Sequence, residues 1–251
     1  MANFILIHGA WHWGGCFDKL AAALTARGHQ VAAPDLAGHG ADTTQAAKVR
    51  DMAQYTAAAR TLLEAVDGQA ILLGHSMGGA SCTYLAEQMP EKIAALVYLT
   101  AFMTPDAASP NDYIFSEAYL QSDAAAEFLS LLSPSATGIR LDVTKPDLLK
   151  QAFYADCDDA EIAALIPQLT LTQPLAPFIS PASITAARGL ACRRIYIECT
   201  QDRAIPLAIQ RQMQADSPGT EVLTMETSHS PFLSHPERLA AMLDQAAQRS
   251  L

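Results

Sequence analysis

Short runs of hydrophobic residues recur along the chain, separated by longer stretches in which apolar residues return every three or four positions. Such short runs indicate strands that are buried on both faces of a parallel sheet, and the intervening pattern is typical of amphipathic helices. The alternation predicts an α/β fold with helices on both faces of a mostly parallel sheet. We expect about six strands, at residues 4–7, 30–33, 70–73, 94–99, 194–198 and 221–225, and helices at residues 17–27, 51–66, 77–88, 206–215 and 236–249.

The alternation stops after residue 101 and resumes near residue 190. Between these points no strand is evident, and segments 123–132, 145–154 and 158–169 have the pattern of short helices separated by Pro, Ser and Asp. A connection of this length is too long for a simple loop in a compact unit. We therefore expect a helical cap at residues 102–189, inserted into a single α/β core made of residues 1–101 and 190–251.

Composition limits the partners of this 251-residue chain, half of which is hydrophobic. With 16 basic and 26 acidic residues, its formal charge of −10 would repel phosphate backbones, so we expect no nucleic-acid partner. Five scattered cysteines without a C-x-x-C pair argue against a disulfide framework and against a zinc site. We expect no metal.

The chain has no apolar stretch near the roughly 20 residues that a membrane span needs. The first apolar run, residues 4–7, is short and no basic segment precedes it, which indicates a first strand and not a signal peptide. We therefore expect a cytoplasmic protein without a membrane partner. The sequence leaves the oligomeric state open, a homodimer included.

The segment GHSMG at residues 74–78 lies between an expected strand and an expected helix. A nucleophile elbow requires this context, with small residues on both sides of the serine so that the tight turn does not clash. The alternative is that Ser76 only caps the following helix. Because strand, glycines and helix are all in place, we interpret Ser76 as a nucleophile.

A serine hydroxyl needs a base within hydrogen-bond reach and an acid that orients this base. In a strand-turn-helix arrangement of this kind the order along the chain is serine, acid, histidine. Downstream of Ser76 the histidines are His229 and His235. His229 follows the last expected strand, at the sheet edge where parallel sheets bind ligands, whereas His235 directly precedes Pro236 and an expected helix. We assign His229 as the base.

The acid is expected to be Asp202, in the loop after the fifth strand. Glu198 lies within that strand, where a sheet-edge or helix-facing position is more typical. Five acidic residues of the cap are expected to be solvated: Asp142, Asp147, Asp156, Asp158 and Asp159.

An oxyanion hole requires backbone N–H groups that are already in place when charge develops on the carbonyl oxygen. Met77, directly after the serine at a helix N-terminus, supplies one. Ala10, in the loop after the first strand, supplies the second, because Gly9 lets the chain approach closely. The alternative for this loop is a simple strand-ending turn.

The substrate pocket is the part of the protein that the sequence predicts least well. Aromatic residues of the cap are more typical of its own core than of a pocket, and Phe232 either lines the pocket or packs the last loop. An apolar cap with few basic residues favours a hydrophobic, uncharged ester of small to moderate size. The candidate substrate-binding residues are Gly9, His75, Phe102, Phe115, Phe128, Phe178, Ser230 and Phe232.

Five segments together resemble the α/β-hydrolase superfamily over nearly the whole chain: ILIHGAWHWGGC, PDLAGHG, LLGHSMGGAS, IYIECTQD and SHSPFLSHPERL. Within it, the chain resembles most the group of plant methylesterases, hydroxynitrile lyases and bacterial pyrethroid-hydrolysing carboxylesterases. The resemblance implies a serine carboxylesterase that hydrolyses a small-molecule ester through an acyl-enzyme and needs no cofactor.

Two positions bear on the choice within this group. The lyases that this chain resembles carry a threonine where it has Gly9, and a lysine directly after the histidine, where it has Ser230. The positive charge of such a lysine would stabilise departing cyanide, so its absence favours the esterase. A hydroxynitrile lyase and a small-molecule receptor on the same fold stay as alternatives, and turnover would distinguish a receptor from an esterase.

Overall fold

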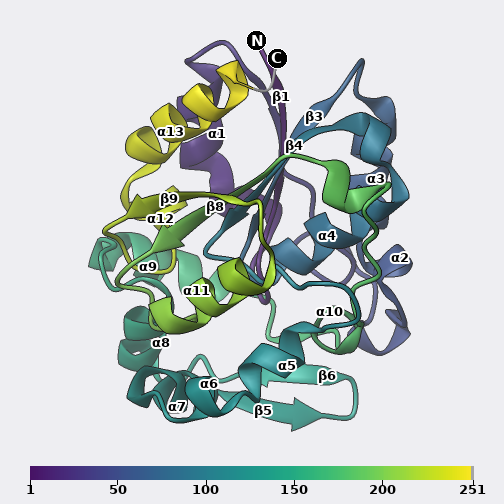
Figure 1. The fold of residues 1–251 in the computed structure, drawn as a ribbon. Coiled ribbons are helices and arrows are strands. Elements are labelled where there is room, and N and C mark those ends of the chain that lie inside the picture. The colour runs from purple at the N-terminus through teal and green to yellow at the C-terminus, as the bar shows by residue number, and fades with distance from the viewer. Residues whose placement is uncertain (250–251) are drawn as a thin grey trace.

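The protein is described by a computed structural model over residues 1–249, in which a six-stranded sheet forms the centre (Figure 1). The strand order is β2-β1-β3-β4-β8-β9, and every neighbouring pair is parallel. The parallel sheet that the hydrophobic pattern predicts is therefore confirmed. Its strands are β1 (Asn3–Ile7), β2 (Gln30–Ala32), β3 (Ala70–His75), β4 (Ile93–Leu99), β8 (Arg194–Cys199) and β9 (Glu221–Met225).

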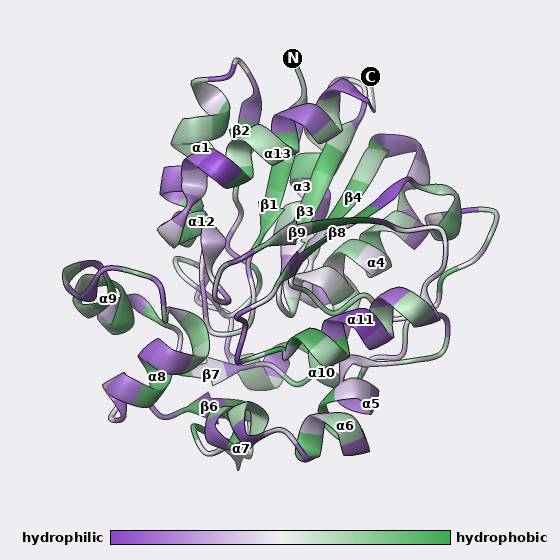
Figure 2. Ribbon diagram, turned by 60° about the vertical axis from the view of Figure 1, so that its left-hand side comes forward, coloured by the Kyte–Doolittle hydropathy of each residue, from purple (hydrophilic) through white to green (hydrophobic). Residues whose placement is uncertain are grey.

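Helices cover both faces of this sheet. Strand β3 is buried along its whole length, as a central strand between two helical layers must be. Figure 2 shows the central strands in the colour of hydrophobic residues, whereas the outer turns of the helices are hydrophilic. Helices α1 and α13 pack together on one side, and α3 and α4 lie on the other (Figure 1). The core helices are α1 (Asp18–Thr25), α2 (Met52–Tyr55), α3 (Ala57–Ala65), α4 (Gly78–Gln88), α11 (Leu207–Asp216), α12 (Pro231–Ser234) and α13 (Pro236–Gln248).

The expected helix at 51–66 is divided into α2 and α3. The break falls at Thr56, whose amide keeps its regular bond to the Met52 carbonyl and whose hydroxyl donates a second bond to the same carbonyl, a contact that often bends a helix.

The segment between β4 and β8 forms a cap over one end of the core, opposite the N-terminus (Figure 1). The expected short helices are present, but the expectation that residues 102–189 contain no strand is wrong. The cap also holds an antiparallel sheet in the order β5-β6-β7. Its elements are α5 (Pro110–Ile114), α6 (Glu117–Leu120), α7 (Asp123–Leu129), β5 (Leu132–Ser135), β6 (Gly138–Leu141), α8 (Pro146–Phe153), α9 (Asp159–Leu165), β7 (Thr172–Gln173) and α10 (Ala176–Ile179).

These cap strands are short and half-exposed, so they lack the apolar run that marks the core strands. The pairing of β6 with β7 depends on a close contact at Gly138, where a Cβ would lie 2.0 Å from the carbonyl oxygen of Gln173. Glycine at this position lets β6 and β7 approach each other, and the local sequence pattern does not predict this pairing. Within residues 1–249, no helix is both long and apolar enough to cross a bilayer.

Candidate active site

Ser76 lies on a sharp turn between β3 and α4 with φ of +54°. A residue with a side chain is strained in this left-handed region, at a cost of about 1–3 kcal/mol, and stays there only when its surroundings hold it. The Ser76 amide donates to the carbonyl of Leu99 (3.3 Å), and its carbonyl accepts from the Phe102 amide (3.0 Å). The turn is thus held on both sides by the end of β4 and the chain just beyond it.

The glycines around Ser76 are required because other backbone atoms lie too close to them for a side chain to fit. A Cβ on Gly74 would lie 2.6 Å from the carbonyl oxygen of Gly78, and a Cβ on Gly78 would lie 2.4 Å from that of Ile7. A Cβ on Gly79 would lie 2.5 Å from the carbonyl oxygen of Phe102. The N-cap of α4 is Met77, without a side-chain capping bond, so the alternative of Ser76 as a helix cap is wrong.

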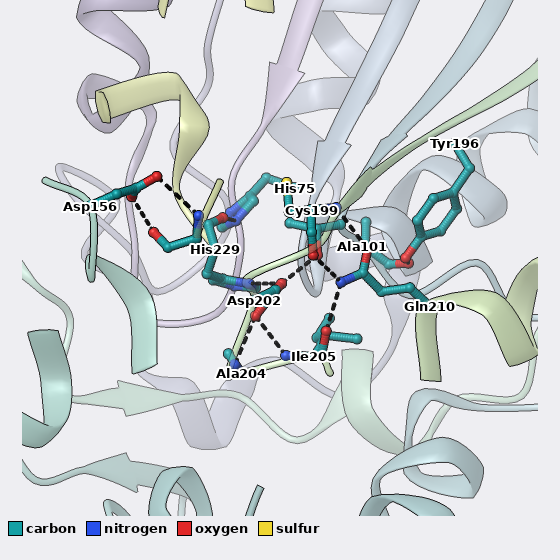
Figure 3. A network of polar contacts seen from close by, with 12 residues as sticks. His75, Ala101, Asp156, Tyr196, Cys199, Asp202, Ala204, Ile205, Gln210 and His229 are labelled. Atoms are coloured by element: carbon teal, nitrogen blue, oxygen red, sulfur yellow. Dashed lines mark hydrogen bonds and ion pairs between the residues drawn. The ribbon is translucent and has the colours of Figure 1, made fainter. Parts of the chain in front are cut away.

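His229 and Asp202 form a buried pair (Figure 3). His229 Nδ1 donates to Asp202 Oδ2 over 2.6 Å, and the hydroxyl of Thr100 donates to the same oxygen. Asp202 Oδ1 accepts from the backbone amides of Ala204 (2.7 Å) and Ile205 (2.9 Å). Four donors thus converge on one carboxylate, which satisfies a charged group away from water.

The other side of the His229 ring is available for proton transfer. Its Nε2 is buried, and within the part of the chain that the structure describes it has no hydrogen-bond partner. His75 Nε2 donates to the backbone carbonyl of His229 over 2.8 Å, and the two rings lie 4.5 Å apart. The residue next to Ser76 in the chain is therefore packed directly on His229.

His75 is buried, and burial lowers its pKa well below the usual value, with a smaller contribution from the neighbouring His229. A neutral His75 carries one N–H, and this N–H is the one directed at the His229 carbonyl. His75 thus braces His229 and does not line the cavity described below.

Ala10 and Met77 line the same cavity as Ser76. Within residues 1–249, neither backbone amide donates a hydrogen bond to another protein group. A Cβ on Gly9 would lie 2.8 Å from Ser76 Cβ and 3.1 Å from His75 Nδ1, so the loop approaches the serine only because residue 9 is glycine. Two unused amides beside a serine provide what an oxyanion hole requires.

A cavity of about 340 Å³ lies over Ser76, between the core and the cap. Its wall is almost entirely apolar and contains no charged side chain. Of the candidate pocket residues, four line it: Phe102, Phe115, Phe128 and Phe178. Phe115 is largely exposed at 64%, so it belongs to both the cavity wall and the surface.

The candidates Gly9, His75, Ser230 and Phe232 do not line this cavity, and these four expectations need correction. Phe232 is fully buried and packs on Phe17 and His75, with ring centroids 4.8 Å away in each case. Ser230 is fully buried beside His229. Both residues are buried away from the cavity, which their proximity to His229 in the sequence does not reveal.

The remaining acidic and histidine candidates are placed as follows. Glu198 faces α11, where it pairs with Arg211 at 3.1 Å, as expected for a helix-facing residue. The expectation that Asp156 is solvated is wrong, because it accepts hydrogen bonds from Ser228. His235 is the N-cap residue of α13, and its side chain is 41% exposed.

Several cavity residues were not expected from the sequence. Trp11 directly follows Ala10, and Ala204 and Ile205 follow Asp202 within three positions, so adjacency to expected site residues was the available signal. No comparable signal marks the cap residues that reach the cavity: Asn111, Ile114, Tyr119, Leu129, Leu132, Ser133, Pro134, Ile139, Leu175 and Ile179. Among residues 1–249, no cluster of His, Cys, Asp and Glu side chains is arranged to hold a metal ion.

A strand-turn-helix serine, a buried acid-histidine pair and a cap inserted after the fourth core strand together define an α/β hydrolase architecture. Residues 4–242 match the α/β hydrolase family, and the chain belongs to this family.

Relatives and solved structures place the chain more narrowly. It is 38% identical over 243 residues to a pyrethroid hydrolase of Sphingobium wenxiniae, an alignment covering 96% of this chain and 85% of that protein. It is 32% identical to methylesterase 7 of Arabidopsis thaliana, covering 98% and 96%. The crystal structure of a pyrethroid hydrolase from Sphingobium faniae JZ-2 superimposes with a TM-score of 0.91 at 36% identity, covering 98% and 97%. The resemblance found in the sequence is confirmed.

Proposed function

We propose that the protein is a serine carboxylesterase in which Ser76 is the nucleophile, His229 the base and Asp202 the acid. The observation that carries the proposal is the buried Asp202–His229 pair beside the Ser76 turn. His229 Nε2 has no hydrogen-bond partner within residues 1–249, and the His229 ring packs on His75. His75 directly precedes Ser76, which is held at φ of +54°. The names of the relatives, pyrethroid hydrolase and methylesterase, support ester hydrolysis.

In the first half of the reaction, Ser76 Oγ attacks the ester carbonyl carbon while its proton passes to His229 Nε2. The carbonyl oxygen becomes negative and accepts hydrogen bonds from the amides of Ala10 and Met77. When the tetrahedral intermediate collapses, the bond to the alcohol oxygen breaks and this oxygen takes the proton from His229. The alcohol leaves, and the acyl group stays on Ser76.

In the second half, water gives a proton to His229 Nε2 and attacks the acyl carbon. The same two amides hold the oxyanion, and Ser76 Oγ leaves with the proton. Asp202 keeps its charge throughout, holds the Nδ1–H tautomer of His229 and stabilises the imidazolium.

The cavity favours a neutral substrate. Its wall has no cation to meet a carboxylate and no anion to meet an amine, and burying either charge without a partner is costly. Aromatic and aliphatic side chains dominate it, and the exposed Phe115 extends the apolar surface outward. We infer a hydrophobic, uncharged ester of small to moderate size.

Lyase chemistry is the second candidate for this scaffold, and two observations disfavour it here. A threonine at position 9 would press on Ser76, because even a Cβ at that position lies 2.8 Å from Ser76 Cβ. Residue 230 is a buried serine, so no ammonium group follows His229 to stabilise departing cyanide. A receptor on the same fold differs from an esterase in releasing product slowly or not at all.

The test is steady-state hydrolysis of p-nitrophenyl acetate and butyrate by the wild type and by Ser76→Ala. We expect multiple turnovers by the wild type and less than a few percent of its activity in the variant. Equal activity in the two proteins would overturn the assignment of Ser76. A cyanohydrin assayed in parallel would reverse the choice of reaction if it were cleaved as fast as the esters.

A further inference from the structure

Gln173, the second residue of cap strand β7, is fully buried and uses every hydrogen-bonding position of its side-chain amide. Its Oε1 accepts from the backbone amide of Trp11 (3.2 Å) and from His39 Nε2 (2.7 Å). Its Nε2 donates to the hydroxyl of Tyr55 (3.1 Å) and to the Pro174 carbonyl (3.3 Å). The orientation of the amide is fixed, since a backbone N–H can only donate and Oε1 must therefore face Trp11.

Trp11 is the residue directly after Ala10, and it has φ of +62°. A bulky aromatic residue is strained in this region and needs external contacts to stay there. Besides the bond to Gln173, the Trp11 carbonyl accepts from the Thr170 amide (2.8 Å), and the indole Nε1 donates to the Ile139 carbonyl (3.0 Å). All three partners belong to the cap, so the cap holds Trp11 in its strained conformation.

The peptide between Ala10 and Trp11 is clamped at both ends. Its N–H belongs to Trp11 and is bound by Gln173, while its carbonyl, that of Ala10, accepts from His12 Nδ1 over 2.8 Å. His12 Nε2 in turn accepts from the hydroxyl of Tyr154, another cap residue, over 2.7 Å. Ala10 lines the cavity, and its own amide is one Cα away from this fixed plane, so the orientation of the plane limits that of the amide.

We propose that Gln173 is a positioning residue for the oxyanion hole, acting through the amide of Trp11 on the adjacent Ala10. The cap thereby contributes to the rate of acyl transfer as well as to the choice of ester. The physical reason is preorganisation: a donor lowers the barrier only if it already points at the place where charge develops. This inference rests on the proposed esterase function, because it concerns the Ala10 donor of that reaction.

The test compares Gln173→Met with the wild type in p-nitrophenyl butyrate hydrolysis. Methionine has a similar length, but its thioether sulfur is only a weak acceptor, so the strong hydrogen bond from the Trp11 N–H is lost. We expect kcat to fall about 10- to 100-fold with KM within about twofold, less than the 10²–10³-fold loss on deleting a donor, because the Ala10 amide is displaced and not removed. Affinity for a trifluoromethyl ketone, whose adduct with Ser76 places a negative oxygen in the hole, should fall by the same factor as kcat/KM.

Two further variants separate positioning from general destabilisation. Tyr55→Phe removes another partner of Gln173 but leaves the bond to Trp11, so it should lower the melting temperature while kcat stays within about twofold of wild type. Burial favours the neutral carboxylic acid in Gln173→Glu, which retains an acceptor for the Trp11 amide and one O–H donor, so this variant should keep more of kcat than Gln173→Met. It also serves if the methionine variant does not fold.

The outcomes distinguish this inference from the proposed function. If the wild type does not turn over esters, or Ser76→Ala turns over equally fast, the esterase assignment fails. If the wild type is active and Ser76→Ala is not, the inference is overturned by a folded Gln173→Met that keeps kcat and analogue affinity. The inference is also overturned if kcat falls as much in Tyr55→Phe as in Gln173→Met. It is likewise overturned if kcat falls more in Gln173→Glu than in Gln173→Met.

Discussion

Asp156, in the cap, accepts hydrogen bonds from both the backbone amide and the hydroxyl of Ser228, the residue directly before His229 (Figure 3). The amide bond measures 3.0 Å, and the carboxylate is mostly buried. A second tie reaches the acid loop, where the hydroxyl of Tyr119 donates to the Ala204 carbonyl over 2.8 Å. Together with Gln173, the cap therefore contacts the loops that carry Ala10, Asp202 and His229, three of the four segments of the proposed site.

Removal of the Asp156 carboxylate should loosen the loop that presents His229. We expect Asp156→Ala to lower kcat about 5- to 20-fold and the free energy of unfolding by about 1–3 kcal/mol, because two buried donors lose their acceptor. Asp147→Ala is the matched control, since Asp147 is exposed at the start of α8. Hydrolysis rates and urea unfolding check both variants, and equal kcat values for Asp156→Ala and the wild type would contradict the positioning role.

Gly9→Ala should damage activity more than stability. The added methyl would lie 2.8 Å from Ser76 Cβ, so the loop bearing Ala10 must retreat from the serine. We expect kcat/KM to fall about 100-fold or more, the scale of a lost oxyanion donor. Gly28→Ala provides the opposite control: its methyl meets nothing within 4 Å, but φ is +84°, so stability falls and activity stays. A fully active Gly9→Ala would show that the loop has room to move.

Asp202→Asn should lower kcat by about 10³- to 10⁴-fold with little change in folding. An asparagine can present its NH₂ group to His229 and so favour the wrong tautomer, leaving a hydrogen on Nε2 where a lone pair is needed. Glu198→Gln is the comparison, because Glu198 pairs with Arg211 of α11, whereas Asp202 pairs with His229. Ester hydrolysis by both variants decides the acid, and a crippled Glu198→Gln beside an active Asp202→Asn would reverse the assignment.

Acid should destabilise the fold between about pH 6.5 and pH 4. Burial lowers the pKa of His12 from 6.5 to about 4, and it lowers the pKa values of His8, His39 and His75 in the same direction. In this window the unfolded chain binds more protons than the folded one, so the free energy of unfolding falls as the pH is lowered. For His12 alone the loss amounts to about 3 kcal/mol.

The measurement for this prediction is urea unfolding at pH 7, 6, 5 and 4. His12→Gln should show a shallower decline than the wild type, since it lacks one of the histidines that must become protonated on unfolding. A wild-type stability that is flat over this range, or that rises toward pH 4, would contradict the neutral state of these buried rings.

The sequence by itself determined the core of the fold through its hydrophobic pattern, and it located the proposed nucleophile through the glycines around Ser76 between a strand and a helix. Strands such as β3 are buried on both faces, so their apolar runs are required by burial and can be read locally. The glycines around Ser76 can be recognised in the sequence for a related reason. The turn at φ of +54° brings backbone atoms so close that larger residues do not fit. The roles proposed for Ser76, Asp202 and His229 are predictions that rest on their positions after the expected strands.

Only the tertiary structure decided how the cap meets this core. The β6–β7 pairing, the burial of Asp156 and the exclusion of Phe232 and Ser230 from the cavity all depend on contacts between residues far apart in the chain. Gln173 is the clearest case, since three of its four hydrogen bonds lead to the Trp11 amide, to His39 and to Tyr55 of α2, and nothing in its own neighbourhood predicts these three. Short-range sterics fix turns and strands, whereas packing between distant surfaces selects which side chains reach the site.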